Sequence, residues 1–168
     1  MIHSILKIVD KLKPFDRVKA HCDIPCKIYD PNGAVVAAMT CVRMMDLIEE
    51  IGAKETLSLS DHAQLARLVN EKEIACRTVK EEVRIIWGDY FKAPQFAKFP
   101  DASELVHSIM MQASKCKQSI AKSEAAELVE KVNQFADMFW QTKDVPTYRA
   151  IVPYPPALEA VFPDLKGS

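Results

Sequence analysis

Apolar side chains recur at helical spacing in four separate stretches of this 168-residue chain, and this periodicity limits the possible fold more than any other feature. A repeat of three to four residues gives a helix one apolar face, which must be buried against another element. Only four residues are glycine and 49% are hydrophobic, so the composition favours a compact helical protein over a β-sandwich or a disordered chain.

The first two helices have clear start and stop signals. One is predicted to begin at Asp30–Pro31 and to end at Gly52, because proline is tolerated in a first turn and glycine commonly closes a helix. A long second helix is predicted to begin within Ser58–Asp61 and to run toward Trp87. The residues expected on their buried faces are Val35, Met39, Val42, Met45 and Ile48 in the first, and Leu65, Val69, Cys76, Val79, Val83 and Ile86 in the second.

Two further helices are predicted after residues 91–100, a segment with two prolines and interleaved aromatic residues that we expect to be an ordered loop. Asp101 with Glu104 forms a capping-box pattern at the start of the third helix, and Ser123 is expected to open the fourth. Their buried faces are expected to contain Val106, Ile109, Met110, Ala113 and Ile120, and Leu128, Val132, Phe135 and Phe139, respectively.

Four amphipathic helices with connections of modest length predict an all-α protein, an antiparallel four-helix bundle. After Lys143 the chain contains five prolines, which exclude another regular helix of any length. This tail, residues 144–168, also contains Tyr148, Tyr154 and Phe162, so we expect it to pack along a surface as extended chain.

Net charge and hydropathy exclude two classes of partner. The formal net charge of −1 provides no basic field for nucleic acid, and no apolar run approaches the length of a membrane span. Residues 1–20 contain five lysine or arginine residues and two aspartates, and end at Ala20 with the small-residue pattern of a processing site. The apolar run at residues 5–9 is too short for a secretory signal, which favours a cytoplasmic protein with a removable pro-segment. The alternative is an amphipathic helix that stays attached.

The nine residues 21–29 combine an imidazole, two thiols and a phenol. If the chain is cut after Ala20, the amine of His21 and the amide and thiolate of Cys22 form two adjacent five-membered chelate rings. The Cys26 thiolate can then complete a planar set of two nitrogens and two sulfurs, with the imidazole as an axial ligand. Such a set favours nickel or copper, whereas zinc prefers a tetrahedron. With Ala20 attached, the His21 nitrogen is an amide and a far poorer donor.

The spacing alone is a weak signal, because two cysteines and a histidine also occur in turns and cores. Asp23 is more often a helix cap or a solvated turn residue, and Tyr29 more often a core aromatic. The remaining cysteines are expected to be ordinary buried thiols, and the lone histidines to be structural or surface residues. These are Cys41, Cys76 and Cys116, and His62 and His107.

Three segments together resemble one known family. The run His21–Cys26 (HCDIPC), followed by Tyr29–Pro31 (YDP), resembles the nickel-hook signature of the nickel-containing superoxide dismutases. Trp87–Lys92 (WGDYFK) resembles that family's motif after its second helix, and Phe139–Lys143 resembles the end of its fourth. The likeness spans residues 21–143.

The resemblance implies an enzyme that converts superoxide to dioxygen and hydrogen peroxide by cycling one nickel ion per subunit between Ni(II) and Ni(III). A maturation peptidase would cut between Ala20 and His21. The His21 amine and imidazole, the Cys22 amide and thiolate, and the Cys26 thiolate would then bind the metal. The mature family fold is a four-helix bundle that assembles as a homohexamer.

The resemblance also implies roles around the metal. Tyr29 would lie by its open face and place superoxide and water, Asp23 would help to fix the hook, and the bond before Pro25 is a candidate cis peptide. Two readings compete with the enzyme: a non-catalytic module in which Cys22 and Cys26 hold zinc or form a reversible disulfide, and a plain helical assembly protein.

The chain departs from the family pattern at three positions. Lys27 stands where glycine is usual. Ala37 stands where the family has a glutamate that holds the axial imidazole, and Ala75 where it has the arginine partner of that glutamate, with Arg77 nearby as a possible substitute. Losing both partners would alter the hold on the imidazole, because such partners orient metal ligands.

Overall fold

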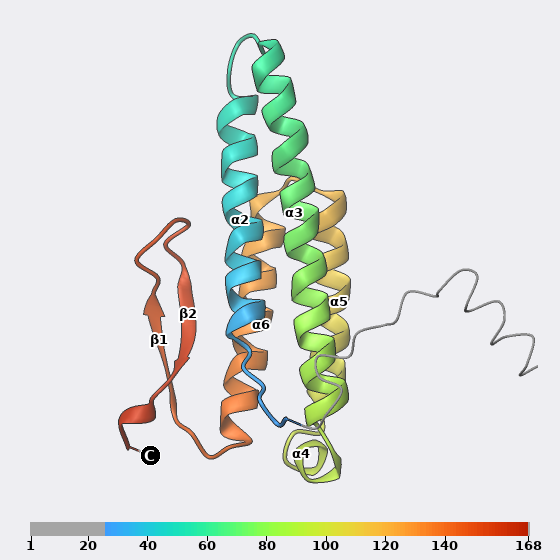
Figure 1. Ribbon diagram of the computed structural model, residues 1–168, viewed down its shortest axis with the longest axis vertical. Coiled ribbons are helices and arrows are strands. Elements are labelled where there is room, and N and C mark those ends of the chain that lie inside the picture. Colours follow the sequence, from blue (N-terminus) through green and yellow to red (C-terminus); the bar gives the residue numbers. More distant parts are fainter. Residues whose placement is uncertain (1–25, 168) are drawn as a thin grey trace, which may run out of the picture.

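The computed structural model describes residues 26–167, and four long helices form its body (Figure 1). These helices are α2 (Asn32–Gly52), α3 (Leu59–Ile85), α5 (Ala102–Gln118) and α6 (Lys122–Gln141). Successive helices run in opposite directions, and each contacts two of the others in the cyclic order α2, α3, α5, α6. The predicted antiparallel four-helix bundle is confirmed. The predicted pro-segment, residues 1–20, lies outside the described residues.

The apolar faces predicted from the periodicity form the core, with two exceptions. All five predicted positions of α2 are buried, as are the four of α6. Val69 and Ile120 are exposed, so these two predictions were wrong, and Leu68 takes the buried position beside Val69. No helix in the described part of the chain combines the length and the apolar character needed to cross a membrane.

The helix ends show which start signals are real. At α3, Ser58 Oγ accepts a hydrogen bond from the Asp61 N–H, while the Asp61 carboxylate accepts one from the Ser58 N–H at 2.9 Å. This reciprocal pair satisfies two amides that a helix start leaves without partners. The Asp101 side chain makes no such bond, so the capping box predicted there was wrong. Helix α6 begins at Lys122, one residue before the predicted start.

After α3 the chain stays helical for one more turn, and the loop predicted for residues 91–100 contains a short helix. Residues Ile86–Tyr90 form a π-helical turn, η1, in which the Phe91 N–H bonds the Ile86 carbonyl at 3.3 Å. A short helix, α4 (Ala93–Lys98), follows. Pro94 is compatible with helix there because it lies in the first turn, where no intrahelical donor is needed.

The proline-rich tail forms a β-hairpin against α6. Strands β1 (Thr147–Ile151) and β2 (Glu159–Pro163) pair antiparallel, with Arg149 opposite Val161. The buried Asn133 of α6 donates to the Glu159 carbonyl at 2.9 Å and accepts from the Val161 N–H at 3.0 Å. The expectation of extended chain packed on a surface holds, and pairing of the two strands adds to it (Figure 1).

Candidate metal centre

Two of the predicted site residues, Cys26 and Tyr29, lie within the described part of the chain. The other predicted ligands, His21 and Cys22, lie outside it, as do Ala20, Asp23 and Pro25. Residues 26–31 lead into the first turn of α2, at the same end of the bundle as α4 (Figure 1). The described part of the candidate site therefore begins at Cys26, the second predicted thiolate ligand.

The segment from Cys26 to Asp30 is shaped by its backbone. Cys26 is half-buried, and Lys27 has φ 58°, in the left-handed region that glycine adopts without steric cost. Asp30 Oδ1 accepts a hydrogen bond from the Asn32 N–H at 2.8 Å, which turns the chain into α2. The glycine that is usual in the family at this position would adopt the same φ without steric cost.

Tyr29 packs against a second tyrosine that the sequence reasoning assigned no role. The rings of Tyr29 and Tyr90 lie 5.6 Å apart between centroids, with planes inclined by 49°. The Tyr90 hydroxyl is 2.6 Å from Thr142 Oγ1, and the Thr142 hydroxyl also bonds the Phe139 carbonyl. The Tyr90 ring packs on Phe139 at 5.0 Å. Tyr90 thereby connects the segment after the predicted hook to the end of α6.

Lysine side chains surround this aromatic cluster. Lys143 Nζ lies 4.7 Å from the centroid of the Tyr90 ring and 5.1 Å from that of Phe139. Lys92 Nζ donates to the Gly88 carbonyl, and Lys98 Nζ donates to the Gln141 carbonyl at 2.6 Å. An ammonium over an aromatic face is attracted by the ring quadrupole. A cation therefore lies over the ring of Tyr90, which Tyr29 also contacts.

The described parts of the three segments that carry the family resemblance meet at this end of the bundle. The π-turn positions Tyr90, the short helix α4 follows it, and the last turn of α6 supplies Phe139 and Thr142. Tyr90 lies in the motif Trp87–Lys92, and Thr142 and Lys143 lie in the motif Phe139–Lys143, but the sequence alone assigned no role to any of them. Membership of these two motifs was the sequence feature that could have pointed to them.

The two alanines that the resemblance matches to a glutamate and an arginine are part of the hydrophobic core. Ala37 on α2 and Ala75 on α3 are both buried and belong to one apolar cluster. Arg77 is exposed on α3. Methyl groups therefore occupy both core positions, and within the described chain the Arg77 side chain points to the surface.

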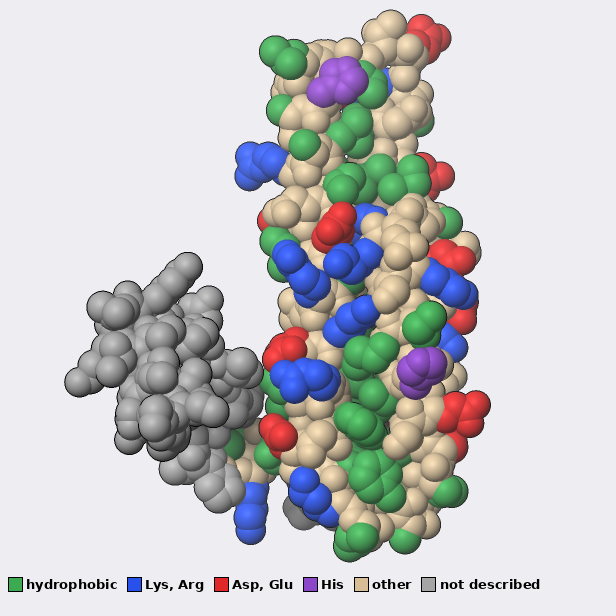
Figure 2. All heavy atoms as spheres, turned by 90° about the vertical axis from the view of Figure 1, so that its right-hand side faces the viewer, with side chains coloured by type: hydrophobic (Ala, Val, Ile, Leu, Met, Phe, Trp, Pro, Cys, Tyr) green, Lys and Arg blue, Asp and Glu red, His purple; other side chains and the backbone are tan. Residues whose placement is uncertain are grey.

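Other sites in the described residues offer less. No group of three or more His, Cys, Asp or Glu side chains within residues 26–167 is arranged to hold a metal ion. His62 and His107 are exposed, on α3 and α5, and on the face in Figure 2 the histidine side chains stand far apart among interspersed acidic and basic groups. Both therefore occupy surface positions, in line with the expectation for lone histidines.

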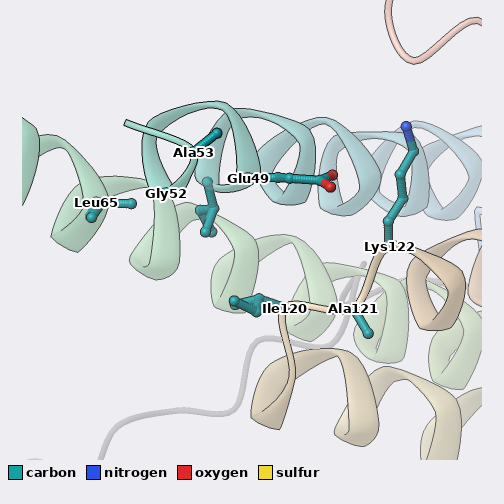
Figure 3. Close-up of a pocket in the computed structure, with 8 residues that line it drawn as sticks. Glu49, Gly52, Ala53, Leu65, Ile120, Ala121 and Lys122 are labelled. Atoms are coloured by element: carbon teal, nitrogen blue, oxygen red, sulfur yellow. The ribbon is translucent and has the colours of Figure 1, made fainter. Parts of the chain in front are cut away.

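A surface pocket of about 610 Å³ lies at the other end of α2 from Tyr29. Ile48, Leu65 and Ile120 give it an apolar lining, with Glu49 and Lys122 as its charged side chains (Figure 3). None of the residues near Tyr29 lines it. The pocket is therefore separate from the candidate metal centre.

The chain is similar to members of one known protein family. The family model described as nickel-containing superoxide dismutase matches residues 16–143. The superoxide dismutase [Ni] of Streptomyces coelicolor is 31% identical over 126 residues, which cover 75% of this chain and 90% of that protein. That of Streptomyces seoulensis is 31% identical over 130 residues, covering 77% and 93%.

Solved structures show the same fold. A native nickel superoxide dismutase matches with a TM-score of 0.64 and 28% identity, covering 73% of this chain and 99% of that one. A nickel-containing superoxide dismutase with nickel ligation corresponding to the oxidized state matches with the same TM-score, at 27% identity and 74% and 99% coverage. The family match covers the whole bundle, and so the chain belongs to the nickel-containing superoxide dismutase family.

Proposed function

We propose that the mature chain begins at His21 and binds one nickel ion through its first six residues. The ligands are the amine and imidazole of His21, the amide and thiolate of Cys22, and the thiolate of Cys26. Nitrogen and thiolate donors in a plane suit nickel or copper, and the family is nickel-containing. The half-buried Cys26, three residues before the packed ring of Tyr29, supports this fit.

When bound, nickel supplies one-electron exchange between Ni(II) and Ni(III), so that one superoxide leaves as dioxygen and another leaves with two protons as hydrogen peroxide. The observation that carries the proposal for this chain is the contact of Tyr29 with Tyr90. This contact fixes the ring of Tyr29, three residues after Cys26. In the proposal, the Tyr29 phenol orients superoxide and water. Asp23 helps to fix the hook.

The positive charge near Tyr29 assists an anionic substrate. Lys143 lies over the Tyr90 ring, and Lys27 is exposed one residue after the proposed ligand Cys26. Positive potential around a site raises the encounter rate of an anion, and this effect weakens as salt screens it. The expected signature is a rate of superoxide consumption that falls with ionic strength.

Removal of residues 1–20 activates the site in this proposal. A maturation peptidase cuts between Ala20 and His21 and converts a poorly donating amide nitrogen into an amine. The test compares the cleaved protein with the full chain, both supplied with nickel and analysed for bound metal and by electron paramagnetic resonance. We expect a rhombic Ni(III) signal with axial nitrogen splitting from the cleaved form only. Bound zinc without that signal would contradict the proposal.

Substitution of the thiolate ligands tests the same site without changing the length of the chain. Cys22→Ser and Cys26→Ser should each abolish superoxide dismutation while the helical circular dichroism stays the same. Cys116→Ala is the matched control, because it removes a thiol that is buried within the bundle. Activity that survives either hook substitution would refute the ligand assignment.

We further propose that the mature protein is a homohexamer, as the family resemblance implies, and that it is cytoplasmic, because the apolar run at residues 5–9 is too short for a secretory signal. Light scattering of the cleaved protein tests the assembly state, with six chains per particle as the expected result. A monomer or dimer at micromolar concentration would overturn the assembly proposal and leave the ligand assignment unaffected.

A further inference from the structure

Three buried thiols from three different helices meet inside the bundle. Cys41 of α2, Cys76 of α3 and Cys116 of α5 each have 0% of their surface exposed. The sulfur atoms of Cys41 and Cys76 are 3.4 Å apart. The Cys116 thiol interacts with both of them. The mechanism proposed for the metal centre uses none of these groups.

A buried ammonium accompanies the thiols. Lys72 lies one turn before Cys76 on α3 and is 2% exposed. Its Nζ donates to the carbonyls of Cys116, Lys117 and Ser119 at 2.7, 2.9 and 2.6 Å, where α5 ends. The ion pairs of the described residues do not include Lys72. A buried charge requires a compensating one, and carbonyl dipoles supply only part of it.

The thiols are electrostatically unequal. Hydrogen bonds from Cys116 and Cys41 lower the pKa of Cys76, the positive charge of Lys72 lowers it further, and burial acts in the opposite direction. The pKa of Cys41 is raised by its hydrogen bonds with Cys116 and Cys76 and by burial. Cys76 is therefore the thiol of this cluster that loses its proton most readily.

The geometry favours sulfur–sulfur chemistry over metal binding. The described part of the chain contains no group of three or more His, Cys, Asp or Glu side chains arranged to hold a metal ion, so the three thiols do not form a metal site. A thiolate in contact with a second thiol is the arrangement that precedes a disulfide. The two sulfur atoms would have to approach by about 1.4 Å to reach the bond length of a disulfide.

We propose that Cys41 and Cys76 are a reversible dithiol–disulfide pair that hydrogen peroxide oxidises. The Cys76 thiolate attacks one peroxide oxygen and the O–O bond breaks, which leaves a sulfenic acid on Cys76 and releases hydroxide. The Cys41 sulfur then attacks the Cys76 sulfur, the S–O bond breaks and the second oxygen leaves as hydroxide. The two thiol protons convert both hydroxides to water, so two electrons pass from the thiols to the peroxide.

The proposal rests on the proposed function only for the origin of the oxidant, since peroxide is the product of superoxide dismutation. Cys41 lies nine residues after the start of α2, about 14 Å along the helix axis from the end of the bundle where Tyr29 packs. Peroxide is small and uncharged, so it enters a core through brief local openings more readily than superoxide does. The disulfide would join α2 to α3 and close a loop of 35 residues.

Peptide mapping of the mature nickel-loaded enzyme tests the proposal. The protein is treated with graded hydrogen peroxide, quenched with catalase, denatured and alkylated with N-ethylmaleimide. We expect a peptide linked through Cys41 and Cys76, with Cys116 alkylated, and dithiothreitol should restore both thiols. Alkylation of both residues at doses that oxidise glutathione completely would overturn the proposal, as would linkage of either residue to Cys116.

Variants separate this proposal from the function of the metal centre. Because peroxide is added directly, a protein carrying Cys22→Ser and Cys26→Ser should form the same disulfide without superoxide dismutase activity. Loss of the disulfide in that protein would contradict the proposal, whereas activity in it would contradict only the proposed function. Cys41→Ala should leave a sulfenic acid on Cys76 that dimedone traps. Oxidation should raise the Tm of the parent protein and leave that of Cys41→Ala unchanged.

Discussion

At the scale of single residues, Lys27 departs from the family pattern at a position where the backbone conformation favours glycine. Its φ of 58° is costly for any residue that has a Cβ atom, because that atom approaches the following carbonyl oxygen. The chain accepts this cost directly after a proposed metal ligand. In return, the position carries an exposed positive charge one residue after the proposed ligand Cys26.

Lys27→Gly should therefore stabilise the nickel-loaded protein by about 1 kcal/mol, because glycine adopts this conformation without the steric penalty. Denaturant unfolding measures the gain. Lys27→Ala is the matched control, since it removes the charge but keeps a Cβ atom. Equal stability of the glycine and alanine variants would show that charge, and not conformation, sets the cost.

The second residue-scale feature is the pair formed by Tyr90 and Thr142. Their hydroxyl oxygens are 2.6 Å apart in a half-buried position, so each should contribute to the stability of the other. Tyr90→Phe keeps the ring that packs on Tyr29 and should cost about 1 kcal/mol of unfolding free energy. A double-mutant cycle with Thr142→Val measures the coupling between the two groups. Fully additive effects would contradict the assigned hydrogen bond.

At the scale of elements, the beginning of α3 is the most completely satisfied helix start. Asp61 accepts hydrogen bonds from the Lys54 ammonium and from the Ser58 hydroxyl and N–H. The Lys54 contact is the main cause that lowers the Asp61 pKa below its ordinary value of 3.8, and the bonds from Ser58 lower it further. The carboxylate also lies in the first turn, where the helix dipole favours negative charge.

This lowered pKa predicts a pH dependence of stability. Because the folded state holds the Asp61 proton more weakly than the unfolded state, its contribution is complete above about pH 4 and is lost as the pH falls through the lower folded pKa. Asp61→Asn should therefore lower the unfolding free energy at pH 6 and approach the parent protein near pH 2. Thermal unfolding across this range measures the difference, and Lys54→Met should weaken its pH dependence. A difference that stays constant with pH would contradict the assignment.

The segment from residue 91 to residue 100 shows where element prediction fails. Two prolines and several aromatic residues are typical of a loop, yet α4 forms within it. Phe91 explains the difference, because its ring is buried and packs on Phe96 and Phe135. Helical geometry here depends on burial against α6, which local propensity does not register.

At the scale of the whole molecule, the C-terminal hairpin is an addition to the family body. The family match ends at residue 143, and the hairpin begins directly after it. Arg149 makes two hydrogen bonds of 2.7 Å to the Glu130 carboxylate, and Asn133 bonds the backbone of β2. The hairpin thus covers α6 through side chains that the helix presents to it.

Deletion of residues 144–168 should lower the Tm but preserve nickel binding and superoxide dismutation, because Tyr29, Tyr90 and Thr142 lie within the family body. Asn133→Ala tests the docking contact with the full chain and should cost about 1–3 kcal/mol, since it leaves two buried backbone groups without partners. Arg149→Met, which removes an ion pair with a half-exposed glutamate, is the control and should cost less than about 1 kcal/mol. An inactive truncated protein with native helix content would contradict the assignment of the hairpin to stability alone.

The helix starts at Ser58 and Asp101 show how much of a helix cap a local sequence pattern can predict. Both positions carry helix-start signals, but only Ser58 forms the reciprocal bonds of a capping box. The backbone at Asp101 is already helical, with φ −85° and ψ −2°, and its side chain does not cap the helix that follows. A cap requires the extended backbone of Ser58, and the path of the preceding segment decides that conformation. Local pattern also fails at Val69, which follows the apolar period of the helix but is exposed to solvent.

By itself the sequence determined the bundle, because an apolar repeat of three to four residues can be buried only by packing helices together. It also identified the family, since the ligands of the proposed hook are contiguous along the chain. Only the tertiary structure decided which groups from distant segments meet: Tyr29 with Tyr90, and Cys41 with Cys76. Contacts of this kind depend on the rotation and register of whole helices, which no single stretch of sequence specifies.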